Sequence, residues 1–167
     1  MNKIIVSSLL FLLTVFHGNL YSGVDFEPFT GEKKLMHQEL ERSYFLHVPE
    51  GLKANAPLIV VIHGYTGSAK GIMDYSKMNN LADKNGFVIV YPQGTVDTRE
   101  NTFFNVGYDF QNNETVDDVA FLQNLNNYFQ NTYSLAADEV FCTGMSNGGD
   151  LCYMLACQAS ETFRAVA

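Results

Sequence analysis

Basic residues are scarce in this sequence of 167 residues. Eighteen aspartates and glutamates stand against ten lysines and arginines, which gives a formal net charge of −8. Because nucleic acids and anionic membrane surfaces attract positive charge, this balance argues against both as partners. Cysteine is also rare, with three residues, and no Cys/His cluster has the spacing of metal ligands. We therefore expect neither a metal site nor a cofactor.

No apolar run is long enough to cross a membrane comfortably. The longest extends from Ile4 to Phe16 with three polar interruptions, whereas a membrane-spanning helix needs about 20 residues. Lys3 precedes this run and small residues surround Ser22, a pattern typical of a secretory signal peptide. We predict that residues 1–22 are a signal peptide and that the protein is secreted, outside the cell or into a periplasm. An uncleaved anchor and a buried helix are the alternatives.

The three cysteines offer few ways to form a disulfide. If Cys152 and Cys157 share a helix, their Cα atoms lie roughly 9 Å apart by helix geometry. A disulfide needs less than about 7 Å, so these two residues cannot pair. A bond between Cys142 and Cys152 is possible, but nothing in the sequence supports it. We favour two buried thiols and one cysteine without a partner.

Strand-like segments recur along the rest of the chain. The segment 23–40 is polar and is predicted to be irregular, and Arg42–Val48 is typical of a first strand. Leu58–Ile62 and Phe87–Tyr91 are continuous apolar runs rich in β-branched residues. Such runs predict strands that are buried on both faces and paired in parallel. Phe163–Ala167 resembles the opening of another strand.

Helix candidates lie between these strands. Met73–Lys84 is predicted to form one helix that ends at Asn85-Gly86. Thr115 is predicted to cap a second helix, with Asp118 three residues later as in a capping box. Between them, Gln93–Glu114 is a long polar loop, and loops of this length are usually functional or mobile. Alternating strands and helices predict an α/β fold with a mostly parallel central sheet.

The strongest functional signal is the run Gly-Met-Ser-Asn-Gly around Ser146. A strand-like run, Glu139–Thr143, precedes it, and Asp150–Cys157 follows with helical spacing. Strand, sharp turn and helix is the order of a nucleophile elbow, in which a strained turn exposes the serine hydroxyl. Gly144 and Gly148 occupy the positions where side chains would collide in such a turn. A plain loop serine is the alternative.

Acyl transfer also needs hydrogen-bond donors for the oxyanion. One donor in this arrangement is the backbone N–H after the nucleophile, here Asn147, and the other comes from a loop after an earlier strand. His63-Gly64-Tyr65 follows such a strand, so the N–H of Tyr65 is the second candidate. Gly64 allows the backbone to approach the substrate closely. We interpret His63 as a structural residue that holds this loop, not as the general base.

Six runs, in chain order, carry a resemblance to a known family: Pro57–Gly64, Gly86–Gly94, Phe104–Gly107, Val116–Phe121, Gly144–Gly149 and Leu155–Cys157. Together they resemble the secreted polyhydroxybutyrate depolymerase and feruloyl esterase family of α/β-hydrolases. The resemblance begins at about Arg42 and continues to Ala167. It departs slightly at Phe104, where the family leads us to expect tryptophan.

This resemblance implies a carboxylic ester hydrolase of the α/β-hydrolase fold with a Ser-Asp-His triad and no cofactor. It implies that Ser146 is the nucleophile and that Tyr65 and Asn147 form the oxyanion hole. The implied substrate is an ester, including polymeric ones such as a polyester or a plant cell-wall polysaccharide ester. Asp117 and Asp118 match the family's motif, but they precede the nucleophile, whereas the fold order is Ser, acid, His. We interpret them as helix-start and loop-tethering residues.

The histidine and the acid of such a triad have no counterpart in this sequence. All four histidines precede the nucleophile: His17, His37, His47 and His63. Beyond Asp150 the only acidic residue is Glu161. Since a serine hydroxyl is weak without a general base, we expect the 167-residue chain to be nearly inactive alone. It resembles the N-terminal part of a longer hydrolase, with residues 41–167 as a partial domain.

Two alternatives to an esterase remain open from the sequence. A serine peptidase or an acyltransferase can be built on the same fold, and the sequence does not identify the acyl-binding loops that would discriminate them. A catalytically silent, hydrolase-like binding protein would also lack a triad histidine. Which ester is the substrate is likewise open at this stage.

Overall fold

The computed structural model describes residues 26–111 and 114–167, so the predicted signal peptide lies outside the described residues. The elements follow in this order: β1 (Phe29–His37), β2 (Leu40–Val48), β3 (Leu58–Ile62), α1 (Ala69–Ser76), α2 (Asn79–Asn85), β4 (Val88–Pro92), β5 (Thr95–Val96), β6 (Thr102–Phe103), the 3₁₀ turn η1 (Asp109–Gln111), α3 (Asp118–Tyr133), β7 (Val140–Gly144), α4 (Asn147–Gln158) and β8 (Ala165–Val166). Within the described residues, no helix has the length and apolar character needed to cross a membrane.

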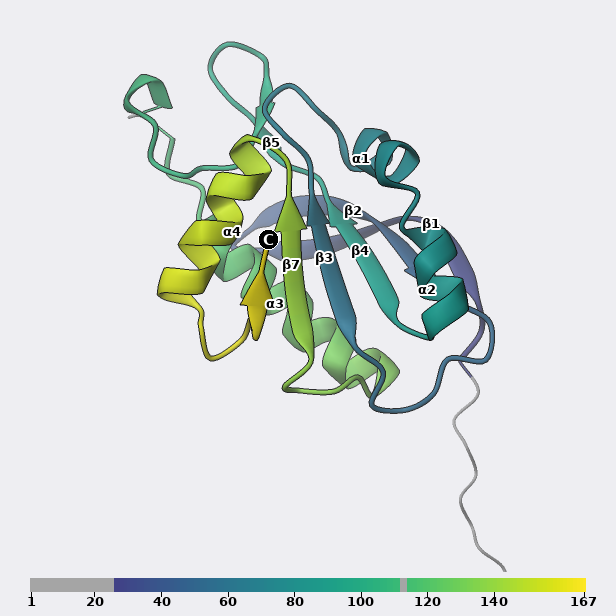
Figure 1. Cartoon of the computed structure of the whole chain (residues 1–167). Coiled ribbons are helices and arrows are strands. Elements are labelled where there is room, and N and C mark those ends of the chain that lie inside the picture. Colours follow the sequence, from purple (N-terminus) through teal and green to yellow (C-terminus); the bar gives the residue numbers. More distant parts are fainter. Residues whose placement is uncertain (1–25, 112–113) are drawn as a thin grey trace, which may run out of the picture.

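Six strands form one sheet in the order β1-β2-β4-β3-β7-β8, with β3 near its centre (Figure 1). β3 pairs in parallel with β4 and β7, and β8 pairs in parallel with β7. The β1–β2 hairpin completes the sheet on the other side through antiparallel pairing of β2 with β4. The predicted α/β fold with a mostly parallel sheet is therefore confirmed. The carboxyl ends of the parallel strands meet at one edge, where open α/β sheets carry their sites.

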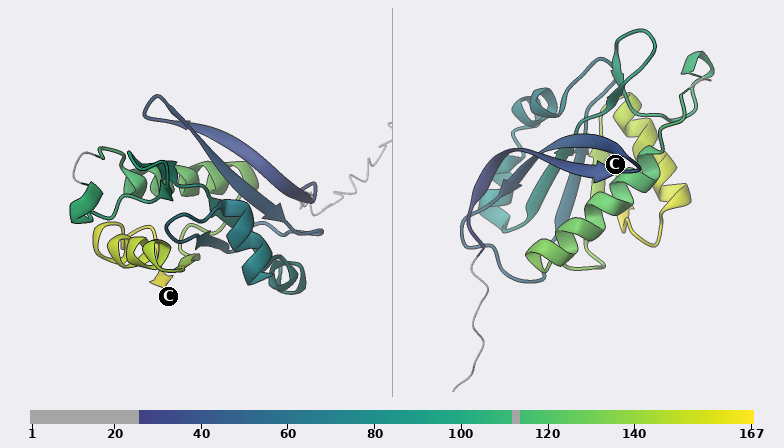
Figure 2. Two further views of the ribbon diagram at one scale, coloured as in Figure 1. Left: turned by 90° about the horizontal axis from the view of Figure 1, so that it is seen from above. Right: turned by 180° about the vertical axis from the view of Figure 1, so that it is seen from behind.

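Successive side chains of the central strands supply a core on each face of this sheet. Val60 and Val90 pack with the buried residues of α3 and α4. Their neighbours Val61 and Ile89 pack with α1 and α2 on the opposite face. Since both faces are covered, the strands carry apolar residues at every position, as the continuous runs predicted. The view from behind in Figure 2 shows α3 and the β1–β2 hairpin in front of the parallel strands of the sheet.

The prediction that residues 23–40 are irregular is wrong for most of the described part, because Phe29–His37 forms β1. This strand pairs with β2 along its whole length, from Phe29 opposite Val48 to His37 opposite Leu40. Most of its side chains are exposed or half-buried, since it lies at the edge of the sheet. An edge strand needs little apolar surface, which explains why its polar composition did not reveal it.

Two helix predictions are also corrected. The predicted helix Met73–Lys84 is two helices, because Lys77 adopts a left-handed conformation (φ 56°) between α1 and α2. Gly86 ends α2 as predicted. The cap of α3 is Asp117, not Thr115: the Asp117 carboxylate accepts a hydrogen bond from the N–H of Ala120 at 2.9 Å. A carboxylate at this position also suits the positive end of the helix dipole.

Candidate active site

A sharp turn joins β7 to α4 (Figure 1). Ser146 lies in this turn, as the elbow pattern predicts. β7 ends at Gly144 and α4 begins at Asn147, so the two elements are separated by Met145 and Ser146 alone. Ser146 has φ 53° and ψ −122°, and its side chain is exposed. This conformation lies outside the left-handed helical region adopted by residues such as Ser134. Strain of this kind costs of order 1–3 kcal/mol and concentrates at functional sites.

The glycines on either side of the turn are required by close backbone contacts. A Cβ atom on Gly144 would lie 2.3 Å from the carbonyl oxygen of Gly148. A Cβ atom on Gly148 would lie 2.5 Å from the carbonyl oxygen of His63 and 2.6 Å from that of Ile62. No side chain fits at such distances, so both positions demand glycine. The first turn of α4 therefore packs directly on the end of β3.

The loop after β3 passes beside the nucleophile. A Cβ atom on Gly64 would lie 3.3 Å from the Cβ atom of Ser146 and 3.1 Å from the carbonyl oxygen of Met145. Among the described residues, the backbone N–H groups of Tyr65 and Asn147 have no hydrogen-bond acceptor. Two unpaired N–H groups thus come from the residues that adjoin Gly64 and Ser146.

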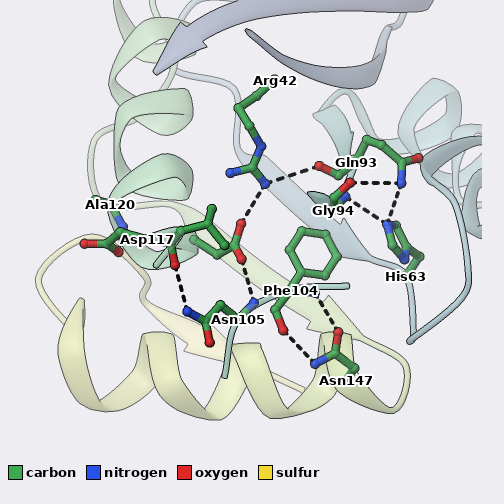
Figure 3. Close-up of polar contacts among 11 residues, drawn as sticks. Arg42, His63, Gln93, Gly94, Phe104, Asn105, Asp117, Ala120 and Asn147 are labelled. Carbon is green, nitrogen blue, oxygen red and sulfur yellow. Dashed lines mark hydrogen bonds and ion pairs between the residues drawn. The ribbon is translucent and has the colours of Figure 1, made fainter. Parts of the chain in front are cut away.

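His63 fixes the orientation of this loop (Figure 3). Its Nδ1 lies 2.7 Å from the carbonyl oxygen of Gly64, which can only accept, so Nδ1 carries the proton. The same oxygen accepts from the N–H of Gly67 at 2.9 Å. In a trans peptide the C=O and the following N–H point in opposite directions. The N–H of Tyr65 is therefore directed away from His63.

Both nitrogens of His63 are engaged. Nε2 accepts from the N–H of Gly94 at 3.0 Å and from the side-chain amide of Gln93 at 3.1 Å. Burial lowers the pKa of the imidazole, while the bond to the Gly64 carbonyl and the charge of Asp118 raise it by smaller amounts. A buried, neutral ring with both nitrogens bonded has no site left to accept a proton from a serine.

The other two histidines of the described part also have structural contacts. His47 lies between the hydroxyl of Thr30, at 2.7 Å, and the carboxylate of Asp83, at 2.8 Å. His37 lies against the ring of Phe121 in α3, with ring centroids 5.8 Å apart. None of these contacts involves Ser146.

Asn147 ties the nucleophile turn to the segment after β6. Its side chain is fully buried, and its Oδ1 accepts from the N–H of Phe104 at 2.8 Å. Its Nδ2 donates to the carbonyl oxygen of Phe104 at 2.9 Å. The Asn147 side-chain amide thus bonds the N–H and the C=O of one residue, as a backbone residue does in a hydrogen-bonded pair of antiparallel strands. Figure 3 shows both bonds. Phe104 in turn packs on His63, with ring centroids 4.8 Å apart.

A buried ion pair secures the same segment from its other side (Figure 3). Arg42 and Asp118 are almost fully buried, with 2.6 Å between guanidinium and carboxylate. The second oxygen of Asp118 accepts from the N–H of Asn105 at 2.7 Å. The Arg42 guanidinium also lies 3.9 Å from the ring of Phe121. The bond to Asn105 confirms that Asp118 tethers a loop, and the cap bond from the N–H of Ala120 confirms that Asp117 lies at the start of the helix.

Aromatic side chains form a rim above the turn. The hydroxyl of Tyr65 donates to Asp97 at 2.7 Å, and its ring packs edge-on against Phe110. Phe110 stacks on Tyr108, with ring centroids 5.2 Å apart. The hydroxyl of Tyr108 donates to Asp150 in the first turn of α4. The rim thus runs from the loop beside Ser146 to the helix that follows it.

One cavity in the described part lies away from Ser146. It has a volume of about 560 Å³ and is bounded by residues from 37–43, 93–96 and 114–116. The groups of His, Cys, Asp and Glu in the described residues include none that could hold a metal ion. We place the site at Ser146 because the strained turn and the unpaired N–H groups meet there.

Sequence reasoning missed the side chains that support the site. The sequence pattern points to the backbone N–H of Asn147, whereas in the structure its side chain also makes two bonds to Phe104. The partners Gln93 and Arg42 were not singled out. Arg42 and Gln93 are polar residues in or next to strand-like runs, and this position is the one signal that could have indicated burial. Because buried polar groups are almost always hydrogen-bonded, burial would in turn predict a partner for each.

Comparison with solved structures shows the α/β-hydrolase fold. An acetyl xylan esterase from Aspergillus awamori superimposes with a TM-score of 0.66 at 20% identity, over 81% of this chain and 50% of that one. An S-formylglutathione hydrolase from Agrobacterium tumefaciens gives a TM-score of 0.66 at 14% identity, over 82% of this chain and 56% of that one.

Curated relatives are similar over most of this chain. Feruloyl esterase B of Thermothelomyces thermophilus is 28% identical over 128 residues, which are 74% of this chain and 42% of the relative. Poly(3-hydroxyalkanoate) depolymerase C of Paucimonas lemoignei is 28% identical over 123 residues, 74% of this chain and 30% of the relative. The chain therefore spans less than half the length of these relatives. A family model described as Esterase PHB depolymerase matches residues 42–167, and the chain belongs to this family.

Proposed function

We propose that this chain carries the nucleophile and the oxyanion hole of a secreted serine esterase that acts on carboxylic esters. The observation that carries the proposal is the conformation of Ser146, a non-glycine residue with φ 53° and ψ −122° at the start of α4. A protein maintains such strain only where its surroundings enforce it. The glycine contacts at residues 144 and 148 supply that enforcement.

In the proposed mechanism, the hydroxyl oxygen of Ser146 attacks the ester carbonyl and forms an acyl-enzyme. The backbone N–H groups of Tyr65 and Asn147 donate to the oxyanion that develops. The N-terminus of α4 adds the positive end of its dipole beneath the same position. His63 acts as a positioning residue, because its bond to the Gly64 carbonyl sets the direction of the Tyr65 N–H.

The general base is proposed to lie outside these 167 residues. His63 has both ring nitrogens bonded, and His47 and His37 lie in contacts of their own. The curated relatives are more than twice as long as the matched part. We propose that a histidine and an acid beyond Ala167 complete the triad.

For the substrate, we propose the ester classes for which the relatives are named: feruloyl, acetyl xylan or poly(3-hydroxyalkanoate) esters.

We further propose that residues 1–22 direct the precursor to export and are removed near Ser22. N-terminal sequencing of the exported product tests this, and a soluble cytoplasmic product that keeps Met1 contradicts it.

The test of the esterase proposal compares two chains. One ends at Ala167, and the other continues along its natural coding sequence. With p-nitrophenyl acetate we expect turnover from the longer chain only, and we expect Ser146→Ala to abolish it. Without a base, the shorter chain retains at most the residual catalysis left when triad members are removed, about 10³–10⁴-fold over water in a serine protease.

Any of three results would overturn the proposal. Ordinary enzymatic turnover by the 167-residue chain would mean that an upstream histidine serves as the base. A coding sequence that stops at Ala167, with no hydrolysis of any ester, would favour a catalytically silent binding protein. Cleavage of peptides in preference to esters would favour a peptidase on the same fold.

A further inference from the structure

Two cysteines face each other directly behind the nucleophile turn. Cys142 lies in β7, before Ser146, and Cys152 lies in α4, after it. Their Sγ atoms are 2.8 Å apart. Both side chains are buried, with 3% and 1% of their surface exposed. The third cysteine, Cys157, is exposed near the end of α4.

The distance between these two Sγ atoms is shorter than expected for two thiols in ordinary non-bonded contact. A thiol is a weak hydrogen-bond donor and a weak acceptor, so a thiol–thiol contact gains little. Two sulfur atoms in ordinary non-bonded contact keep a wider separation, because repulsion rises steeply inside the dispersion minimum. Burial raises the pKa of Cys142, so no thiolate charge draws the two groups together. A covalent bond would require an approach of about 0.8 Å, to the usual S–S length of about 2.05 Å.

We propose that Cys142 and Cys152 form a disulfide bond that joins β7 to α4 across the nucleophile turn. The bond would enclose residues 143–151, including the strained Ser146. Cys157 is excluded as a partner of Cys152 because both lie in α4, a helix turn and a half apart. It is excluded as a partner of Cys142 because it is exposed, whereas Cys142 is buried.

The reaction is thiol–disulfide exchange with a small-molecule or protein disulfide as the oxidant. The thiolate of Cys142 attacks one sulfur of the oxidant and forms a mixed disulfide with it, while the S–S bond of the oxidant breaks and its other sulfur leaves as a thiolate. The thiolate of Cys152 then attacks the Sγ of Cys142 and expels the second oxidant sulfur. The two protons lost by the cysteines are taken up by the two departing thiolates. The oxidant gains two electrons, and the cysteine pair loses two.

Burial sets when this bond forms. In the folded chain both thiols are shielded from an oxidant, and the raised pKa of Cys142 keeps it protonated. Exchange needs an accessible thiolate, so the bond is expected to close while the chain folds. Once closed it restricts the unfolded chain through a short loop. By the loop-entropy relation, such a loop favours the folded state about a hundredfold.

The first test counts thiols in the Cys157→Ser variant, which leaves only the proposed pair. The denatured, reduced chain is refolded with oxidised glutathione, and remaining thiols are alkylated in denaturant. We expect no alkylated thiol, a mass lower by two hydrogens, and a digest fragment that links Cys142 to Cys152. Two alkylated thiols, or glutathione retained on either cysteine, would overturn the proposal.

A second test uses the chain with all three cysteines. Its digest is expected to show the link between Cys142 and Cys152, with Cys157 outside it, and a link from Cys157 to either would overturn the proposal. Reductant should then lower the folding equilibrium constant about a hundredfold, the size expected for this loop. The matched control is Cys142→Ala with Cys152→Ala, in which reductant should change nothing. An equal response in both proteins would show that no bond forms between this pair.

Discussion

The nucleophile turn and the long segment that supports it are built by different physical means. The turn, residues 144–148, depends on the absence of side chains, because backbone atoms occupy the space that any Cβ would need. The segment 93–105 depends on buried polar groups that come from distant parts of the chain, such as Arg42 and Asn147. Steric constraints of the first kind are local in sequence, whereas pairings of the second kind connect residues far apart.

This difference explains which residues can be altered. At the turn, a single added methyl group should disrupt the packing of α4 on β3. In the supporting segment, a change should be tolerated unless it leaves a buried group without its partner. The predictions that follow test each side of the comparison, from the largest expected effect to the smallest.

Gly148→Ala should have the largest effect. Its Cβ would lie 2.5 Å from the carbonyl oxygen of His63, so α4 must move away from β3. We expect a loss of about 4 kcal/mol in the free energy of unfolding, measured by urea titration with circular dichroism. The control is Gly149→Ala, where the nearest contact is 3.4 Å and alanine favours the helix. Equal losses in both variants would refute the steric account.

Asp118→Asn should be nearly as damaging, because it leaves the Arg42 guanidinium buried without a charge partner. Breaking a buried pair in this way costs about 3 kcal/mol or more. The control is the exposed pair of Lys34 and Glu41, also 2.6 Å apart. We expect Glu41→Gln to leave the urea midpoint unchanged, since solvent screens exposed pairs. A small loss for Asp118→Asn would mean that Arg42 finds other partners.

Asn147→Ala should have a moderate effect. It removes both bonds to Phe104 and leaves a buried N–H and carbonyl unpaired, at a cost of about 2 kcal/mol. Asn131→Ala is the control, because this exposed side chain bonds only the Asn127 carbonyl of its own helix. Thermal unfolding of both variants gives the comparison. Indistinguishable melting temperatures would show that the bonds to Phe104 contribute little.

The smallest predicted effect is a pH dependence. Burial lowers the pKa of His63, so the unfolded chain binds a proton more readily than the folded chain below the ordinary pKa of 6.5. The contribution of His63 to stability is therefore fully present above that value and is lost as the pH drops below it. His63→Asn keeps a donor for the Gly64 carbonyl but cannot titrate. Between about pH 8 and pH 5, its melting temperature should fall less than that of the unaltered chain.

The sequence was most informative where a local composition pattern causes the structure. The apolar runs at 58–62 and 87–91 identified the central parallel strands, and the glycines at 144 and 148 identified the turn. The edge strand β1 was missed because its stability comes from pairing with β2, not from its own apolar surface. The break at Lys77 was missed because a left-handed lysine has no sequence signature.

The supporting contacts of the site could not be predicted for a related reason. Arg42 and Asp118 are separated by 76 positions, and Phe104 and Asn147 by 43. The local sequence around each of these residues does not indicate its partner, because the two members of each pair come together only in the folded protein. The position of the nucleophile was therefore readable, while the groups that hold the neighbouring loops were not.

The central claim is that Ser146 is the nucleophile, and covalent labelling tests it most directly. The chain that continues beyond Ala167 is treated with a fluorophosphonate probe, digested, and analysed by peptide mass spectrometry. We predict a label on Ser146 alone, and no label after Ser146→Ala. A label on another serine, or labelling that persists in the Ser146→Ala variant, would contradict the account.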